Sequence, residues 1–223
     1  MKLCIVYPAQ AHSAYRIAAE SFADLARKIA GAESCLVSDD AYEHQKTQAD
    51  LTVLIGNDAV NSVVADLYLE KETDSFGVRY GCDDYCIRTA EIGGKKLLFL
   101  AGGRPRAAIY AVYRYFELYC GCRWFWDGDR IPKAELVLSG IDLVESPRFD
   151  YRGLRYFAHR SLHRFQAEHW SFEDWVAEID WILKKRLNLF MLRIGMDDLF
   201  QKAFPDLVSY PRSDEKLPGA GDG

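Results

Sequence analysis

The sequence predicts an α/β fold: a small α+β domain with a mixed sheet and helices, followed by the first βαβ unit of an incomplete (β/α)8 barrel. Three observations lead to this prediction. Short apolar segments alternate with amphipathic helical segments over residues 1–126, a pattern typical of sheets connected through helices. Gly93-Gly94 separates two apolar segments as a two-residue hairpin turn, which makes part of the sheet antiparallel. Residues 151–194 then repeat a strand, helix, strand pattern.

Six strands are predicted in the first part of the chain, because short apolar runs there are bounded by turn residues. They are Lys2 to Tyr7, Ser34 to Val37, Asp50 to Ile55, Tyr85 to Ile92, Lys95 to Ala101 and Cys122 to Trp126.

Three helices are predicted between these strands from apolar residues at helical spacing. They are Ser13 to Ala30, Ala59 to Glu70 and Arg104 to Tyr119. Gly31 and Gly121 are expected to end the first and third helices, since glycine favours the position after a helix. Asn57 is expected to cap the second helix, and Pro105 suits the first turn of the third.

A domain boundary is predicted after residue 146. Residues 127–147 have a loop composition, interrupted only by the short apolar piece Leu136 to Leu138, and they read as a connection between domains. The predicted domains are therefore 1–146, an α/β domain, and 147–223, the start of a barrel.

The second part contains two predicted strands, Tyr151 to Phe157 and Asn188 to Ile194, and one amphipathic helix, Phe172 to Lys185. Parallel strands of this kind need both faces covered. A complete barrel takes about 250 residues, so we expect this unit to be the truncated front of a longer protein.

Composition excludes several classes of partner. The net charge of −5 gives no general attraction to phosphate backbones, so nucleic acid is not expected as a partner. No apolar run approaches the roughly 20 residues of a membrane span. The first residues have one lysine and a short apolar run that ends at Pro8; this is not a signal peptide, and the expected location is the cytoplasm.

Two cysteine pairs, Cys82-x3-Cys86 and Cys120-x-Cys122, raise the alternative of a zinc site. Their spacings differ from paired C-x2-C knuckles, so buried thiols are the favoured interpretation. We predict no metal site and no cofactor.

The turn at Gly102-Gly103 is a candidate anion site. It follows a strand, and the next helix opens with Arg104 and Arg106. Free N–H groups at a helix start, together with two guanidinium groups, are suited to a phosphate. The segment matches neither G-x-G-x-x-G nor a P-loop, so the pattern indicates phosphate binding only weakly.

The block from this turn to Pro132 is the most distinctive part of the sequence. Its features are Gly103-Arg104, a helix rich in Ala and Tyr, the strand Gly121 to Phe125, and Ile131-Pro132. This block resembles the small α/β domain that precedes the catalytic barrel in several exo-acting glycoside hydrolases. These include family 20 β-hexosaminidases, α-glucuronidases and α-N-acetylglucosaminidases.

The resemblance continues into residues 151–198. Family 20 enzymes open the barrel with an aromatic-Arg-Gly/Ser strand, here Tyr151-Arg152-Gly153, whose arginine binds hydroxyls of the terminal sugar. A second arginine eight residues on is matched by Arg160. Paired aspartates after the second barrel strand are matched, with a shift, by Asp197-Asp198. The resemblance therefore implies substrate contacts from Arg152, Arg160, Asp197 and Asp198.

The sequence also departs from family 20. Phe157 stands where that family has an aspartate, and no Gln-Gly-Trp motif follows the second strand. The stretch Trp175 to Gly195 resembles α-N-acetylglucosaminidases at least as closely, so the resemblance does not select one family.

The implied function is that of the N-terminal part of a glycoside hydrolase acting on terminal sugars, with a carbohydrate substrate bound through the full-length protein. No catalytic residue is assigned, because the resembling families carry the acid on later barrel strands. Two alternatives stay open: a non-enzymatic carbohydrate-binding or structural module, and a phosphate- or nucleotide-binding α/β protein that uses the turn from Gly102 to Arg106.

Overall fold

The structure is a computed structural model that describes residues 1–43, 48–69, 76–154, 170–190 and 202–206. The chain forms two compact units. The first contains Met1–Arg152 together with Ala177–Asn188, and the second contains Gly153–Val176 and Leu189–Gly223. The predicted boundary after residue 146 stays a prediction. The first unit includes a segment from the later part of the chain, Ala177–Asn188.

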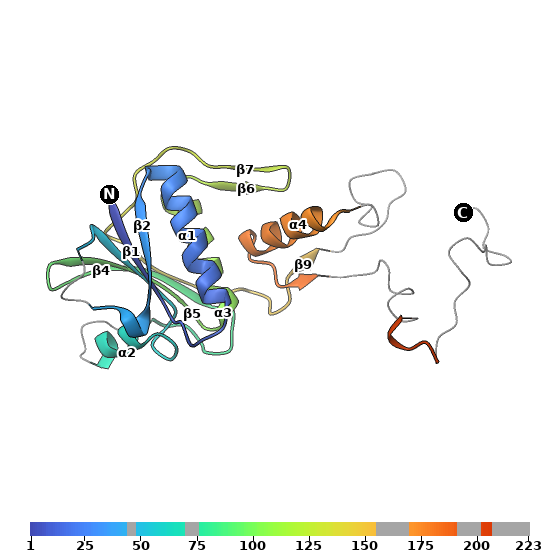
Figure 1. Cartoon of the computed structure of the whole chain (residues 1–223), viewed down its shortest axis with the longest axis horizontal. Helices are drawn as coiled ribbons and strands as arrows, with labels where there is room; N and C mark the ends of the chain where they lie inside the picture. The colour runs from blue at the N-terminus through green and yellow to red at the C-terminus, as the bar shows by residue number, and fades with distance from the viewer. Residues whose placement is uncertain (44–47, 70–75, 155–169, 191–201, 207–223) are drawn as a thin grey trace. The chain divides into compact units, whose positions relative to one another are not determined.

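The first unit is built on a six-stranded mixed sheet with the order β2-β1-β3-β5-β4-β8 (Figure 1). β1, β2, β3 and β5 are parallel, and β4 is antiparallel to both β5 and β8. The mixed α/β sheet predicted from the sequence is thereby confirmed. The strands are β1 (Lys2–Tyr7), β2 (Glu33–Ser38), β3 (Leu51–Ile55), β4 (Tyr85–Ile92), β5 (Lys95–Gly102) and β8 (Asp142–Glu145).

Helices cover both faces of this sheet. Because side chains alternate along a strand, Leu3 and Ile5 of β1 face one apolar cluster while Cys4 and Val6 face the other. The first cluster contains α1 (Ala14–Ala30) and α3 (Pro105–Tyr119), which lie side by side, and the second contains α2 (Ser62–Leu69). A short 3-10 turn, η1 (Asp39–Ala41), precedes β3.

Two local features follow the predicted chemistry closely. Gly31 has a φ of 63° and its N–H donates to Arg27, so it ends α1 in the left-handed conformation that glycine adopts readily. Gly93 and Gly94, with φ values of 57° and 74°, form the turn between β4 and β5.

The start of the second helix differs from the prediction. Asn57 accepts a hydrogen bond from the N–H of Ala59 and heads a turn. Asn61 accepts hydrogen bonds from the N–H groups of Val63 and Val64, and is therefore the residue that caps α2. The helix begins at Ser62 rather than at Ala59.

Beyond α3, the chain forms the hairpin of β6 (Arg123–Phe125) and β7 (Gly128–Arg130). Trp124 of β6 is buried and its ring packs edge-on against Tyr113 at 5.3 Å between centroids. The strand β7 and the edge strand β8 were not predicted. The apolar piece Leu136 to Leu138 is not a strand, although Leu136 is buried in the core.

In the second unit, β9 (Gly153–Leu154) and β10 (Leu189–Phe190) pair in parallel, with Leu189 opposite Gly153. The helix α4 (Phe172–Lys184) connects the two strands, and its residues from Ala177 onward group with the first unit. The predicted strand, helix, strand pattern is present in the described residues. Within the described ranges, no helix is both long enough and apolar enough to cross a membrane.

Candidate functional site

The candidate site centres on Asp83, in the loop that leads into β4. The register of the β4–β5 hairpin places Tyr85 opposite Gly102, so this loop lies beside the turn that starts α3. Contact there is close: a Cβ at Gly103 would lie 2.1 Å from the carbonyl oxygen of Arg79. A Cβ at Gly102 would lie 2.6 Å from the backbone nitrogen of Ala108. The two glycines thus serve close backbone packing.

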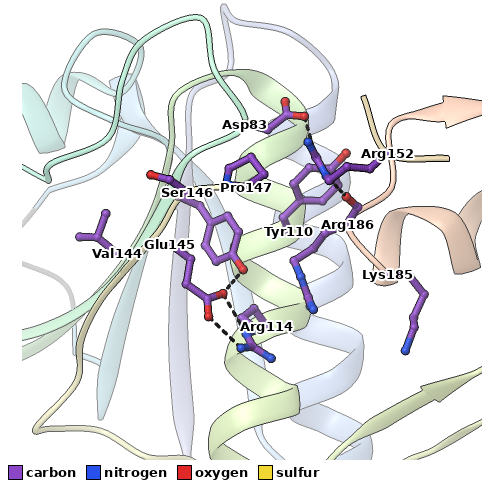
Figure 2. A pocket seen from close by; sticks show the side chains of 11 residues that line it. Asp83, Tyr110, Arg114, Val144, Glu145, Ser146, Pro147, Arg152, Lys185 and Arg186 are labelled. Atoms are coloured by element: carbon purple, nitrogen blue, oxygen red, sulfur yellow. Dashed lines mark hydrogen bonds and ion pairs between the residues drawn. The ribbon is translucent and has the colours of Figure 1, made fainter. Parts of the chain in front are cut away.

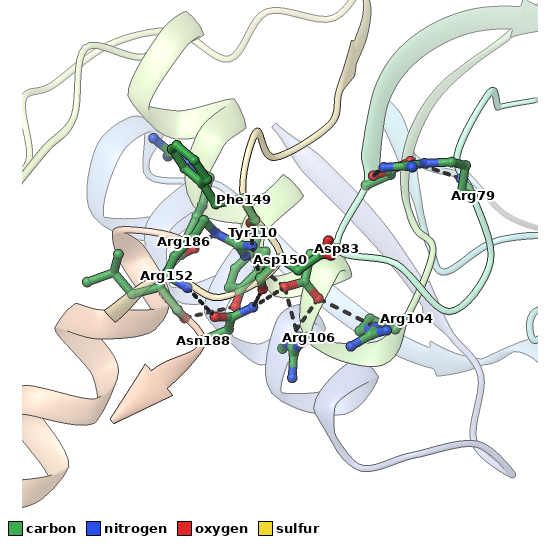
Figure 3. A network of polar contacts seen from close by, with 12 residues as sticks. Arg79, Asp83, Arg104, Arg106, Tyr110, Phe149, Asp150, Arg152, Arg186 and Asn188 are labelled. Carbon is green, nitrogen blue, oxygen red and sulfur yellow. Dashed lines mark hydrogen bonds and ion pairs between the residues drawn. The ribbon is translucent and has the colours of Figure 1, made fainter. Parts of the chain in front are cut away.

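The Asp83 side chain is only 3% exposed and joins three segments of the chain (Figure 3). Its Oδ1 accepts a 2.8 Å hydrogen bond from Nε of Arg106 on α3. Its Oδ2 accepts 2.7 Å bonds from the guanidinium of Arg152 and from the side-chain amide of Asn188. Arg104 approaches the same carboxylate at 3.6 Å.

These donors keep the Asp83 carboxylate charged. Burial alone raises the pKa of a carboxyl group, but the hydrogen bonds from Arg106, Arg152 and Asn188 outweigh burial and hold the pKa of Asp83 below its usual value. The pKa of neighbouring Asp84 is also lowered. The chief cause is Arg79, whose Nε donates a 2.7 Å hydrogen bond to the Asp84 carboxylate.

Arg152 and Asn188 also bind each other. The backbone N–H of Asn188 donates to the carbonyl oxygen of Arg152 at 2.8 Å, and the backbone N–H of Arg152 donates to Oδ1 of Asn188 at 2.8 Å. Since Gly153 pairs with Leu189, these two residues form the rung immediately before the β9–β10 pair. Asp83 thus binds the residues that directly precede both strands.

A cavity of about 490 Å³ lies next to this network, and all its lining residues belong to the first unit (Figure 2). On its far wall, the guanidinium of Arg114 donates to both carboxylate oxygens of Glu145, at 2.7 and 2.9 Å. The hydroxyl of Tyr85 donates to the same carboxylate. Burial opposes these bonds, yet they hold the pKa of Glu145 below its usual value.

Arg186, at the edge of the same cavity, has a φ of 60°. It follows α4, and the bonds Arg186 N to Leu183 O and Leu187 N to Ile182 O form the helix ending that usually employs glycine. A non-glycine residue is strained in this conformation. Two contacts hold Arg186 in this conformation. Its guanidinium binds Glu117 at 2.9 Å, and its carbonyl oxygen accepts a hydrogen bond from Nε of Arg152 at 2.8 Å.

Of the four predicted substrate-binding residues, the structure describes Arg152 alone; Arg160, Asp197 and Asp198 lie outside the described residues. The side chain of Arg152 is 15% exposed. Besides Asp83 and the carbonyl of Arg186, its guanidinium donates to the carbonyl oxygen of Phe149 at 2.8 Å. These bonds suit a residue that holds the fold, so a sugar contact by Arg152 stays a prediction.

The predicted anion site already faces an anion of the chain itself. Arg106, and more distantly Arg104, pair with Asp83, so the guanidinium groups offered for a phosphate are balanced internally. This geometry disfavours the phosphate-binding alternative.

The cysteines of the two candidate zinc pairs lie on different faces of the sheet. Cys86 belongs to the apolar cluster on one face of the sheet, whereas Cys120 and Cys122 belong to the cluster on the other face. In the part of the chain that the structure describes, no group of three or more His, Cys, Asp or Glu side chains is arranged to hold a metal ion.

The carboxylates around the cavity are poorly suited to proton donation. A glycosidase acid needs a raised pKa, whereas ion pairs lower the pKa values of Asp83, Asp84, Glu117 and Glu145. What the arrangement does chemically is fix backbone segments through charged hydrogen bonds. Sequence reasoning missed Asp83 and Asn188 as members of the network.

No protein-family model matches the chain, but a curated protein and solved structures are similar to it. The chain is 25% identical to human alpha-N-acetylglucosaminidase over 178 residues, which is 79% of this chain and 22% of the relative. It thus spans less than a quarter of the length of that curated protein.

Among solved structures, the GH115 4-O-methyl-alpha-glucuronidase BtGH115A, described as specific for decorated arabinogalactans, superposes with a TM-score of 0.60. The sequence identity is 14%, over 84% of this chain and 24% of that chain. CpGH84D matches 50% of this chain and 16% of its own, with a TM-score of 0.35 and 13% identity. The chain is therefore similar in sequence to part of one glycoside hydrolase and similar in fold to part of another.

Proposed function

We propose that the chain is part of an exo-acting glycoside hydrolase and is not catalytic by itself. In this proposal, residues 1–146 form an accessory α/β domain and residues 147–223 begin a (β/α)8 catalytic barrel. The observation that carries the proposal is the 25% identity to human alpha-N-acetylglucosaminidase, which extends over 79% of the chain.

Two structural observations support it. The fold similarity to BtGH115A covers 84% of the chain, so it is not confined to one short motif. The parallel pairing of β9 with β10 across α4 is the unit from which a (β/α)8 barrel is built.

Barrel architecture distinguishes candidate substrate contacts that follow a strand from one that precedes a strand. Barrel enzymes build their sites at the carboxyl ends of the strands, and the opposite face serves stability. Arg160 follows β9 in the sequence, and Asp197 and Asp198 follow β10, so we propose these three as sugar contacts. Arg152 directly precedes β9, and its proposed sugar contact competes with its role in the Asp83 network.

The substrate is proposed to be a terminal sugar of an oligo- or polysaccharide. The name of the human relative makes an aryl α-N-acetylglucosaminide the first substrate to assay. Glycosidase chemistry usually needs two carboxylates flanking the bond, and the paired carboxylates around the described cavity have lowered pKa values.

The test compares this 223-residue chain with the product of its complete reading frame on a panel of aryl glycosides. We expect turnover from the complete product and none from the chain alone. Turnover by the chain that disappears when one of its own carboxylates is replaced would contradict the second part of the proposal. A complete product that binds oligosaccharides without cleaving any panel member would favour a carbohydrate-binding module.

A further inference from the structure

We propose that Asp83 is a positioning residue that sets the register of the β9–β10 strand pair. The catalytic significance of this role rests on the proposed function, since β9 and β10 would be the first two barrel strands. The structural role itself is independent of any activity.

One oxygen atom binds the residues that precede both strands. Oδ2 of Asp83 accepts from Arg152 and from Asn188, each at 2.7 Å. The carboxylate is itself fixed to α3, because its other oxygen accepts from Nε of Arg106 at 2.8 Å. Two donors that bind the same buried, charged acceptor are both restricted in position.

The Asn188 side chain completes the rung. Its Oδ1 accepts the backbone N–H of Arg152, and its Nδ2 donates both to Asp83 and to the carbonyl oxygen of Asp150 at 2.6 Å. Asn188 is therefore bound on both sides of its amide group, and it can sit opposite Arg152 only in the observed register.

The register of the β9–β10 pair has to be specified by contacts of this kind. A slip of one residue turns every side chain of a strand to the other face. The next rung allows little freedom, because a Cβ at Gly153 would lie 2.6 Å from the carbonyl oxygen of Leu189. Any other residue at that position would carry the Cβ that this approach excludes, so the Asp83 network and Gly153 specify the same pairing.

The consequence for the proposed enzyme follows from chain order. Arg160 comes after β9, and Asp197 and Asp198 come after β10. In the proposed barrel, a register error at Arg152 and Asn188 would shift β9 and β10, and these three residues follow those strands in the chain. Asp83 thus acts through the two strands and touches no substrate.

The experiment uses the whole 223-residue chain, labelled with ¹⁵N, and follows amide hydrogen exchange by NMR. We expect Asp83→Asn to speed exchange at the N–H groups of Arg152 and Asn188 at least tenfold, while the amides of β3 keep wild-type rates. Asp83→Glu, which keeps the charge, should restore part of the protection. Asp142→Asn is the matched control: it removes an ion pair with Arg88 on the edge of the same sheet and should leave both amides unchanged.

A folded Asp83→Asn chain with wild-type exchange at Arg152 and Asn188 would overturn the proposal. If that variant fails to fold, Asn188→Ala replaces it, because it keeps the Asp83–Arg106 pair and removes the side-chain hydrogen bonds of Asn188 to Arg152, Asp83 and Asp150. We expect Asn188→Ala to speed exchange at Arg152 and to weaken the cross-strand NOE between Leu189 and Gly153; unchanged values would overturn the proposal. No sugar is involved, so this test can fail while the glycosidase assay succeeds, and the reverse.

Discussion

The carboxylate of Glu178 accepts a 2.6 Å hydrogen bond from the indole N–H of Trp126, in the turn of the β6–β7 hairpin. Glu178 is 5% exposed, and Lys184, the last residue of α4, binds Asp129 of the same hairpin at 2.6 Å. The second half of α4 is thus fastened to the hairpin by two polar contacts, which explains why Ala177–Asn188 groups with the first unit.

The first prediction concerns Glu178→Gln, which we expect to stabilise the chain near neutral pH. Burial raises the pKa of Glu178, and the Trp126 hydrogen bond only partly opposes burial. A carboxyl group with a raised folded-state pKa stabilises the fold below its unfolded pKa of about 4.3, and this stabilisation is lost as pH rises through the folded-state pKa. Glutamine keeps the acceptor oxygen and carries no charge to bury.

The measurement is urea unfolding between pH 4 and pH 8. The midpoint of Glu178→Gln should exceed that of the wild type at pH 8 and approach it at pH 4. Glu173→Gln is the matched control: Glu173 is exposed in the first turn of α4, where a negative charge is favourable by about 0.3–1 kcal/mol, so this change should slightly destabilise. A Glu178→Gln variant weaker than wild type at pH 8 would contradict the expected sign.

The second prediction concerns Gly103→Ala, which we expect to destabilise the chain and disturb the Asp83 loop. The new Cβ would lie 2.1 Å from the carbonyl oxygen of Arg79 and 2.8 Å from that of Cys82. Backbone must move to accept it, and overpacking of this kind costs about 1–3 kcal/mol or more. Thermal unfolding measures the loss.

Gly94→Asn is the control for Gly103→Ala. Gly94 has a φ of 74° and open space around its Cβ position, and asparagine tolerates this conformation in hairpin turns. A loss of stability at Gly94 as large as at Gly103 would contradict the assignment of the Gly103 effect to close packing.

The third prediction is that native thiols react in two groups. Cys35 is exposed and Cys82 is half-buried, and we expect these two to react with an aromatic disulfide within minutes at pH 8. Burial raises the pKa of Cys120 to about 12 and those of Cys4, Cys86 and Cys122 to about 11, so these four should react only after denaturation. Rapid labelling of Cys120 in the folded chain would contradict the core assignment.

Local patterns predicted much of the first unit. β1 and β4 have the predicted bounds, and α1 and α3 each begin one residue later than predicted, because apolar spacing, glycine stops and the Gly93-Gly94 turn all act within a few residues. β8 was missed, since a four-residue edge strand is defined by its pairing with β4, more than 50 residues earlier. Asn57 was predicted to cap the second helix, but Asn61 caps it, because asparagine suits either position and the residue type alone does not fix the helix start.

Part of the candidate site was within reach of the sequence. A two-residue turn at Gly93-Gly94 sets the hairpin register, and continuing it past Tyr85 and Gly102 places Asp83 opposite Arg104. An aspartate facing the arginines of the proposed anion turn was therefore a readable signal. The rung between Arg152 and Asn188 was not, because the register of two parallel strands joined through a helix depends on tertiary packing.

The fourth prediction concerns Arg152→Lys and separates its two proposed roles. Arg152 donates at once to Asp83, to the carbonyl of Arg186 and to the carbonyl of Phe149, all within 2.8 Å. A lysine ammonium is a compact point charge that cannot reproduce the planar guanidinium fork. Hydrogen bonds to charged groups contribute about 1.5–3 kcal/mol, so we expect the chain to lose about that much stability in urea unfolding. Arg148→Lys, in the same segment, is the control and should change stability by less than about 0.5 kcal/mol.

The same variant, introduced into the complete product, tests the sugar contact. If Arg152 holds the strand starts, activity should fall together with stability, and cooling or a stabilising osmolyte should recover much of it. If Arg152 binds sugar hydroxyls, kcat/KM should fall about ten- to a hundred-fold while the melting temperature of the variant stays at the wild-type value. The bonds seen around Arg152 make the first outcome the expected one, and an unchanged melting temperature would return Arg152 to the sugar site.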